Sequence, residues 1–278
     1  MGHLPSANLR SAVGHLSDED WLSLVDESRG ANTWEHDFRL PGFPGADVES
    51  MTTMPASAAM LREAGRFYGI TKQALEQHGD GLNHDTQLLD FGCGWGRITR
   101  YFLKDVEVGS IHGVDVVDEL VQACRETIAP DQFSAVPSSG PLPFADASFD
   151  VVLANSVFSH FDADRHRLWI NELGRVAKPG GLLLLTVVDQ KALAKWLDRT
   201  GDWREWFDGV VGPAWRVRLE LASGRFVWRS TSRQGALEGY GLAFVPQRWS
   251  TREWRRHDLE IVDIRRDYGQ AVYVARKH

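Results

Sequence analysis

Apolar residues alternate between two spacings along the middle of the chain. Short apolar runs at 88–91, 110–114, 149–154 and 182–188 predict buried strands. Helical spacing at 98–103, 117–128 and 165–176 predicts helices between them. The Lys178-Pro179-Gly180-Gly181 tetrapeptide is expected to stop the last of these helices. Strands that alternate with helices over short connections predict a doubly wound α/β sheet, whose parallel strands are apolar because helices cover both faces.

The capping signals and apolar spacing in residues 1–84 predict a helical segment that precedes this core. Ser17 precedes three acidic residues and is expected to cap a helix that runs through Val25, since acids suit the positive end of a helix. Residues 57–77 have apolar positions at helical spacing, although Gly65 and Gly69 weaken the pattern. Residues 41–45 are a loop by composition.

Residues 189–247 interrupt the alternation and are expected to form an inserted α/β cap. Alternation in 216–221 and 225–229 around Ala222-Ser223-Gly224 predicts a β-hairpin. The segment also holds five of the eleven tryptophans: Trp196, Trp203, Trp206, Trp215 and Trp228. Two interpretations stay open: an apolar lid over a bound acceptor, or the core of a small subdomain. Residues 248–278 then predict the two closing strands of the sheet, at 260–265 and 271–275.

Composition narrows the class of protein. The net charge of -7 does not favour nucleic acid or an anionic membrane as a partner. Two cysteines among 278 residues exclude a disulfide scaffold, so we expect reduced thiols and a cytoplasmic location. The longest apolar run, 182–188, is too short to span a bilayer, and the first residues lack the apolar run of a signal peptide.

The stretch from Leu88 to Arg97 carries the main chemical signal. A strand ends at Phe91, glycines occupy positions 92, 94 and 96, and a helix follows. Glycines allow a positive φ and let a ligand approach the backbone, while the free N–H groups of a helix start favour an anion. A dinucleotide-binding turn would have a third glycine where Arg97 stands, and it would not need Asp90 two residues before the first glycine.

The acidic-x-G-x-G-x-G pattern of Asp90 to Gly96 resembles the first motif of class I S-adenosylmethionine-dependent methyltransferases. The resemblance covers about residues 85–188 and the last two strands, and bacterial small-molecule methyltransferases are the nearest in pattern. It implies a mostly parallel, seven-stranded, Rossmann-like sheet with S-adenosylmethionine as cofactor. By this resemblance, Gly92 and Gly94 border the methionine part of the cofactor, Asp90 supports the loop and the amino group, and Cys93 serves as a small residue in the loop.

Three later motifs appear in the order that this resemblance requires. Asp115, at the end of the second strand, is suited to accept hydrogen bonds from both ribose hydroxyls, and Val116 would lie beside adenine. Residues 142–152 resemble the loop into the fourth strand, and residues 172–186 resemble the helix, turn and fifth strand. The acid that relatives often use for the adenine amine is absent, so recognition of adenine falls to backbone groups or to Ser138 and Ser139.

Three residues outside these motifs are candidates for the site. Asn155 follows the fourth strand and is expected to line the cofactor pocket, because ligands bind at the carboxyl ends of the strands. His160 is the candidate general base, with local packing as the alternative. Tyr68 either closes over the cofactor or packs in the core. No cluster of residues has metal-ligand spacing, and the Asn155-Ser156-Val157-Phe158 sequence lacks the prolines typical of nucleic-acid amino-methyltransferases.

The predicted function is methyl transfer from S-adenosylmethionine to oxygen or nitrogen of a small-molecule acceptor. The resemblance suggests a secondary metabolite or a sugar, but it does not transfer a substrate. Two alternatives remain at this point: an NAD-dependent oxidoreductase, and a non-catalytic partner protein with the methyltransferase fold.

Overall fold

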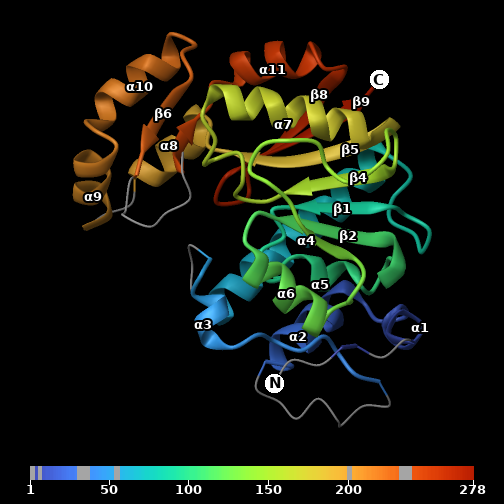
Figure 1. The fold of residues 1–278 in the computed structure, drawn as a ribbon. Helices are drawn as coiled ribbons and strands as arrows, with labels where there is room; N and C mark the ends of the chain where they lie inside the picture. Colours follow the sequence, from blue (N-terminus) through green and yellow to red (C-terminus); the bar gives the residue numbers. More distant parts are fainter. Residues whose placement is uncertain (1–3, 6–7, 30–37, 53–56, 199–201, 232–239) are drawn as a thin grey trace. The chain divides into compact units, whose positions relative to one another are not determined.

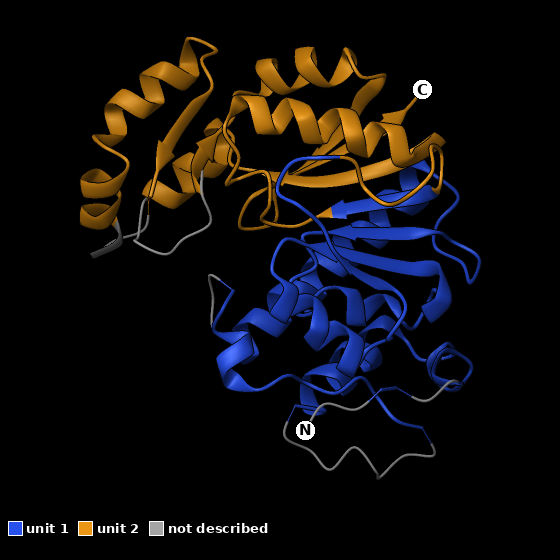
Figure 2. Ribbon diagram, in the orientation of Figure 1, with its two compact units in different colours: residues 1–140, 149–153 blue, residues 141–148, 154–278 orange. Residues whose placement is uncertain are grey.

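The computed structural model describes residues 4–5, 8–29, 38–52, 57–198, 202–231 and 240–278 (Figure 1). The chain divides into two compact units (Figure 2). Unit 1 comprises residues 1–140 and 149–153, and unit 2 comprises residues 141–148 and 154–278. The side chain of Trp203, one of the five cap tryptophans, lies outside the described residues.

Unit 1 contains the amino-terminal helices and the first strands. Its helices are α1 (Leu9–Val13), α2 (Asp18–Glu27), α3 (Ala46–Glu49), α4 (Ala58–His78), α5 (Thr99–Phe102) and α6 (Asp118–Thr127), with a short 3-10 turn η1 (Val108–Ser110). Its strands are β1 (Leu88–Phe91), β2 (Ile111–Asp115), β3 (Phe133–Ala135) and all but the last residue of β4 (Phe149–Ala154). β1 pairs in parallel with β2 and β4, and β2 pairs in parallel with β3.

Unit 2 contains the remaining elements. Its helices are α7 (Ala163–Val176), α8 (Gln190–Leu197), α9 (Asp202–Val210), α10 (Ala214–Ala222) and α11 (Gln247–Arg255). Its strands are β5 (Ala177–Val187), β6 (Val227–Ser230), β7 (Gly241–Phe244), β8 (Leu259–Arg265) and β9 (Ala271–Lys277). β9 is antiparallel to β5 and β8, and β6 pairs with β7 in a separate two-stranded sheet.

The main sheet has seven strands in the order β3-β2-β1-β4-β5-β9-β8. The expected doubly wound, mostly parallel sheet of seven strands is therefore confirmed, with antiparallel strands at one edge. The sequence patterns located six of these strands; β3, which has three residues, was missed. β5 begins at Ala177, directly after α7, so the predicted stop motif forms the start of a strand.

The amino-terminal helices follow the predicted signals. Ser17 caps α2, and its hydroxyl accepts a hydrogen bond from the Asp20 amide. Gly65 lies inside α4, on the side that faces α2. A Cβ at this position would come within 2.7 Å of the end of the Leu22 side chain on α2. The glycine that weakens the helix pattern therefore lets α2 and α4 approach each other.

The predicted β-hairpin at 216–221 and 225–229 is wrong. Residues 214–222 form α10, and the second half of the predicted hairpin pairs with β7. Ala214, Val217 and Leu221 are buried, which is the spacing of one helix face, whereas Leu219 is 64% exposed. Short apolar–polar alternation fits a strand or a helix, and here packing selected the helix.

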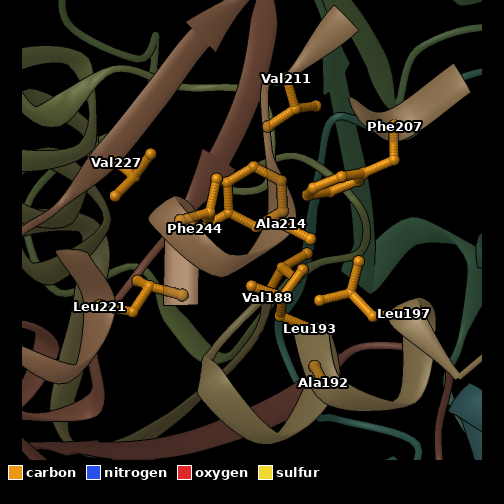
Figure 3. Close-up of a cluster of buried hydrophobic side chains, with 11 residues drawn as sticks. Val188, Ala192, Leu193, Leu197, Phe207, Val211, Ala214, Leu221, Val227 and Phe244 are labelled. Atoms are coloured by element: carbon orange, nitrogen blue, oxygen red, sulfur yellow. The ribbon is translucent and has the colours of Figure 1, made fainter. Parts of the chain in front are cut away.

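The inserted segment has its own apolar core (Figure 3). Eleven buried residues from α8, α9, α10, β6, β7 and the positions directly after β5 and α9 pack together: Val188, Ala192, Leu193, Leu197, Phe207, Val211, Ala214, Val217, Leu221, Val227 and Phe244. The Val245 amide donates to the Val188 carbonyl at 2.9 Å, so the segment leaves and returns at one point. Trp206 and Trp215 are 42% and 67% exposed, so neither belongs to this core.

Candidate functional site

The glycine-rich turn after β1 has three glycines with positive φ: 76° at Gly92, 54° at Gly94 and 77° at Gly96. These glycines have different neighbours. A Cβ on Gly96 would lie 2.3 Å from Ile128 Cδ1, so this glycine permits close packing against the end of α6. A Cβ on Gly94 would meet Thr52 Cγ2 at 3.5 Å, with nothing closer among the described residues. Gly94 therefore requires glycine for its positive φ and not for close packing.

Asp115 at the end of β2 is tied to the glycine-rich turn. Its Oδ2 accepts from the Gly94 amide at 2.9 Å, and its Oδ1 accepts from the Val117 amide at 3.0 Å. Burial raises the pKa of Asp115, and these backbone hydrogen bonds oppose the rise. Each carboxylate oxygen has a second lone pair, so Asp115 retains capacity to accept two hydroxyl groups. Val116 follows Asp115 and is 38% exposed.

Asp90 lies inside the molecule, 2% exposed, and its Oδ2 accepts from Thr99 Oγ1 at 2.6 Å. Burial raises the pKa of Asp90 to about 6, despite this hydrogen bond. The contact joins the end of β1 to the start of α5, across the glycine-rich turn. Asp90 therefore connects the two ends of the glycine-rich turn.

Cys93 is buried in the same turn and lies against a second cysteine, Cys124 of α6. The hydrogen bond with Cys124, together with burial, raises the pKa of Cys93 well above its ordinary value. The Cys124 thiol also donates to the Gly94 carbonyl at 3.2 Å. A thiol held in its protonated form is a poor nucleophile, so the structure favours the packing role for Cys93.

Arg100 is a residue of this region that the sequence patterns did not single out. It is 1% exposed, and its guanidinium lies over the rings of Phe43 and Trp95, at 4.2 and 4.8 Å from their centroids. It donates to the Gly96 carbonyl and to the Gly42 carbonyl. Arg100 thus joins the loop at 41–45 to the glycine-rich turn. Its signal in the sequence is a charge within the apolar run Ile98 to Leu103.

The remaining predicted residues of unit 1 have different surroundings. Ser138 and Ser139 follow β3 and are exposed, so their hydroxyls are accessible to a ligand. Tyr68 is fully buried in α4, its hydroxyl donates to Asp105, and its ring lies edge-on to Phe102. The structure therefore favours core packing for Tyr68 and not closure over a cofactor.

Asn155 and His160 both lie in unit 2, in the segment that follows β4. The Asn155 amide donates to the Tyr268 hydroxyl at 3.0 Å, which fixes the orientation of its side chain. His160 has partners at both ring nitrogens: the Gly241 carbonyl lies 2.9 Å from Nδ1, and the Tyr240 hydroxyl lies 3.0 Å from Nε2.

The tautomer of His160 follows from these partners. A carbonyl only accepts, so Nδ1 carries the proton and Nε2 accepts from Tyr240. Burial lowers the pKa of His160 to about 4, although the bond to Gly241 opposes this. The Tyr240 ring also stacks on the imidazole, with centroids 4.3 Å apart. Tyr240 was missed because 80 residues separate the pair in the sequence.

A metal-binding cluster and a membrane-spanning helix are both absent from the described residues. Within the described ranges, no three His, Cys, Asp or Glu side chains are grouped so that they could hold a metal ion. Among the helices described, none is both long enough and apolar enough to cross a bilayer.

Comparison with known proteins gives the family of the central region. Residues 89–185 match the family described as methyltransferase domain. The chain is 34% identical, over 122 residues, to 2-methyl-6-phytyl-1,4-hydroquinone methyltransferase of Synechocystis sp., covering 42% of this chain and 37% of that protein. It is 26% identical, over 237 residues, to ribosomal RNA small subunit methyltransferase C of Hahella chejuensis, covering 78% of this chain and 64% of that protein. The chain therefore spans only part of the length of these two curated relatives.

Among solved structures, the chain is similar to the 1,6-didemethyltoxoflavin-N1-methyltransferase of Burkholderia thailandensis, which was solved with 1,6-didemethyltoxoflavin and S-adenosylhomocysteine. The TM-score is 0.50 at 18% identity, covering 94% of this chain and 91% of that one. This similarity establishes the fold.

Proposed function

We propose that the protein transfers a methyl group from S-adenosylmethionine to a small-molecule acceptor, because residues 89–185 match the methyltransferase domain family and the chain shares the fold of a solved methyltransferase. The cofactor supplies an already activated methyl group, so the chemistry needs little covalent help from the protein. What the chain contributes is binding, orientation and the exclusion of water.

The observation that carries the proposal is the hydrogen-bonded unit of the glycine-rich turn and Asp115. The glycine-rich turn is proposed to accept the methionine part of the cofactor, and Asp115 to bind the ribose hydroxyls through its remaining lone pairs. Val116 supplies an exposed apolar surface for adenine, and Ser138 and Ser139 supply exposed hydroxyls after the neighbouring strand. Gly92, Cys93 and Asp90 maintain the conformation of the turn.

The alternative of an NAD-dependent oxidoreductase is disfavoured by the match of residues 89–185 to the methyltransferase domain family. The alternative of a non-catalytic partner is disfavoured by the intact turn, because its glycines retain positive φ and Asp115 retains its contact with Gly94. Loss of cofactor binding would be expected to relax these demands on the sequence.

A small molecule is the proposed acceptor for two reasons. The net charge of -7 opposes binding of a long polyanion such as RNA. The segment 189–247 has a core of its own and is a suitable cap for a pocket that shields the acceptor from water. The similarity to an rRNA methyltransferase makes RNA the acceptor against which this proposal is tested.

The His160–Tyr240 pair limits the kind of acceptor. Because Tyr240 occupies Nε2, His160 takes a proton from an acceptor only through the Tyr240 hydroxyl. A base with a pKa of about 4 is weak at neutral pH. We therefore favour an acceptor that attacks without losing a strongly held proton, such as an amine nitrogen or a carboxylate, over an alcohol. Asn155 is proposed to line the cofactor pocket.

The cofactor assignment is tested by calorimetric titration with S-adenosylmethionine, S-adenosylhomocysteine and NAD. The expected result is binding of the first two, with affinity at least tenfold weaker in Asp115→Ala. Asp131→Ala is the matched control, since Asp131 is an exposed acid of unit 1 that precedes β3, at the opposite end of the strands from Asp115. Binding of NAD alone would refute the proposal, and so would unchanged affinity in Asp115→Ala.

The acceptor class is tested with cofactor labelled in its methyl group. The expected result is label in small molecules that carry amine or carboxylate groups, with none in total RNA. Label that appears in RNA alone would refute the small-molecule acceptor while leaving the cofactor assignment intact. Rates that stay flat between pH 6 and pH 8 would agree with the low pKa of His160, whereas an ionisation near pH 7 that disappears in His160→Asn would contradict it.

A further inference from the structure

A basic pocket of about 790 Å³ lies within unit 2, and none of its lining residues is among those assigned to the cofactor. It is formed by the start of α8, one side of α11 and the residue that follows β8. The lining residues are Asp189, Gln190, Lys191, Gln247, Arg248, Thr251, Arg252, Arg255, Arg256 and Arg266. Six of these ten side chains are cationic and one is acidic.

The single acid of the lining is already committed to the protein. Asp189 is 1% exposed and caps α8 through the amides of Lys191 and Ala192. Its other oxygen lies 2.5 Å from the Arg266 guanidinium and accepts from the Tyr273 hydroxyl. Asp189 therefore holds Arg266 at the pocket and leaves the other five cations without neutralisation from the lining.

The arginines of α11 share one face of the helix. Arg248, Arg252 and Arg255 follow at intervals of four and three residues, so their side chains lie along one stripe. Trp249 and Trp254 are buried on the opposite side, where α11 packs against α7 and β8. The packing of the tryptophans thus turns the arginine stripe outward to the pocket.

Glu253 of α11, which is not part of the lining, is shared among arginines. It is 3% exposed at its side chain and pairs with Arg167, Arg252 and Arg256. Lys191, Arg248 and Arg255 are exposed, and the structure gives them no acidic partner within the described residues. Like charges four residues apart on a helix repel each other, so this stripe gains stability when an anion binds.

We propose that this pocket binds a small molecule that carries at least two phosphoryl groups. Guanidinium groups present flat pairs of N–H donors that match phosphate oxygens, and three unpartnered cations favour a ligand with more than one negative charge. A volume of about 790 Å³ is in the range of small-molecule sites and exceeds what one phosphate fills. Gln247 Nε2 and the lone pairs of the Thr251 hydroxyl, which donates to the Gln247 carbonyl, are the neutral polar groups left for the rest of the ligand.

The test is calorimetric titration of the full chain with pyrophosphate, orthophosphate and a short single-stranded RNA. Pyrophosphate is expected to bind at least tenfold more tightly than orthophosphate. In the double variant Arg248→Ala/Arg255→Ala its affinity is expected to fall at least tenfold. Both side chains are exposed, so the variant should fold, and circular dichroism and the unchanged affinity for S-adenosylmethionine report this independently of the pocket.

The matched control is Arg204→Ala/Arg218→Ala, which removes two positive charges from the exposed surfaces of α9 and α10. Its affinity for pyrophosphate should equal that of the wild type. Equal weakening in both double variants would reduce the effect to net charge and overturn the proposal. Binding of RNA without binding of pyrophosphate, or equal affinity for pyrophosphate and orthophosphate, would also overturn it.

Discussion

His166, inside α7, is buried among aromatic rings and should make the protein acid-sensitive. Phe158, Trp249 and Phe226 surround the imidazole with ring centroids at 4.7, 4.9 and 5.7 Å. Its Nε2 accepts from Trp254 Nε1 at 3.2 Å, and its Nδ1 has no hydrogen-bond partner among the described residues. Burial, with a smaller effect of Arg167, lowers the pKa of His166 to about 3.

The sign of the pH dependence follows from this shift. The folded state keeps His166 neutral, whereas the unfolded chain takes up a proton near pH 6.5. The contribution of neutral His166 to the stability of the folded state is therefore complete above pH 6.5 and is lost as the pH falls toward 3. Between pH 8 and pH 5 this one group should lower the free energy of unfolding by about 2 kcal/mol.

The assay is urea unfolding at pH 8 and pH 5, followed by tryptophan fluorescence, for the wild type and His166→Gln. Glutamine retains an acceptor for Trp254 and does not titrate, so the variant should lose about 2 kcal/mol less than the wild type over this interval. His160 titrates in both proteins and cancels in the comparison. His84→Gln, at an exposed position, is the control. Equal losses in wild type and His166→Gln would refute the reasoning.

Three further predictions concern stability. Asp90→Asn should remove a pH dependence of opposite sign. Because burial raises the pKa of Asp90 to about 6, the protonated carboxyl stabilises the fold below pH 3.8, and this stabilisation is lost as the pH rises through 6. Urea unfolding across that range should show a loss of about 3 kcal/mol in the free energy of unfolding of the wild type that the variant lacks. Gly96→Ala should cost about 1–3 kcal/mol more than Gly94→Ala in thermal unfolding, because only at Gly96 would the new Cβ overlap Ile128, and equal losses would contradict this. Phe207→Ala should destabilise the inserted core by about 3–5 kcal/mol, and a change below about 1 kcal/mol in chemical unfolding would show that this core contributes little.

The sequence patterns located the central sheet well because its strands are both apolar and bounded by glycines or helix signals. β4 was predicted at its observed bounds, and the capping role of Ser17 was confirmed. β3 was missed because three residues carry too little periodicity to be recognised. The hairpin was wrong because Leu219 followed the alternation while its side chain lies on the exposed face of α10.

The contacts within the candidate site depend on long-range pairing and were less accessible from the sequence. The motif predicts Asp115 as a site residue, but its bond to the Gly94 amide depends on the parallel pairing of β1 and β2. The partners of His160 come from β7 and the residue before it, 80 or more positions away. Spacing along the chain contains no information on such partners, so the neutral, fully bonded state of His160 required the structure.

The hydrogen bond between Val188 and Val245 has a consequence for how such a protein can diversify. Because the chain departs and returns at neighbouring backbone positions, the distance that a replacement must bridge is short, and loop-closure entropy grows slowly with length. Material of different size and composition between these two residues would leave the pairing of β5 with β9 unstrained. This junction is therefore a natural point for exchange of the inserted segment by recombination, and it offers protein engineers a place to graft a different segment onto the same sheet.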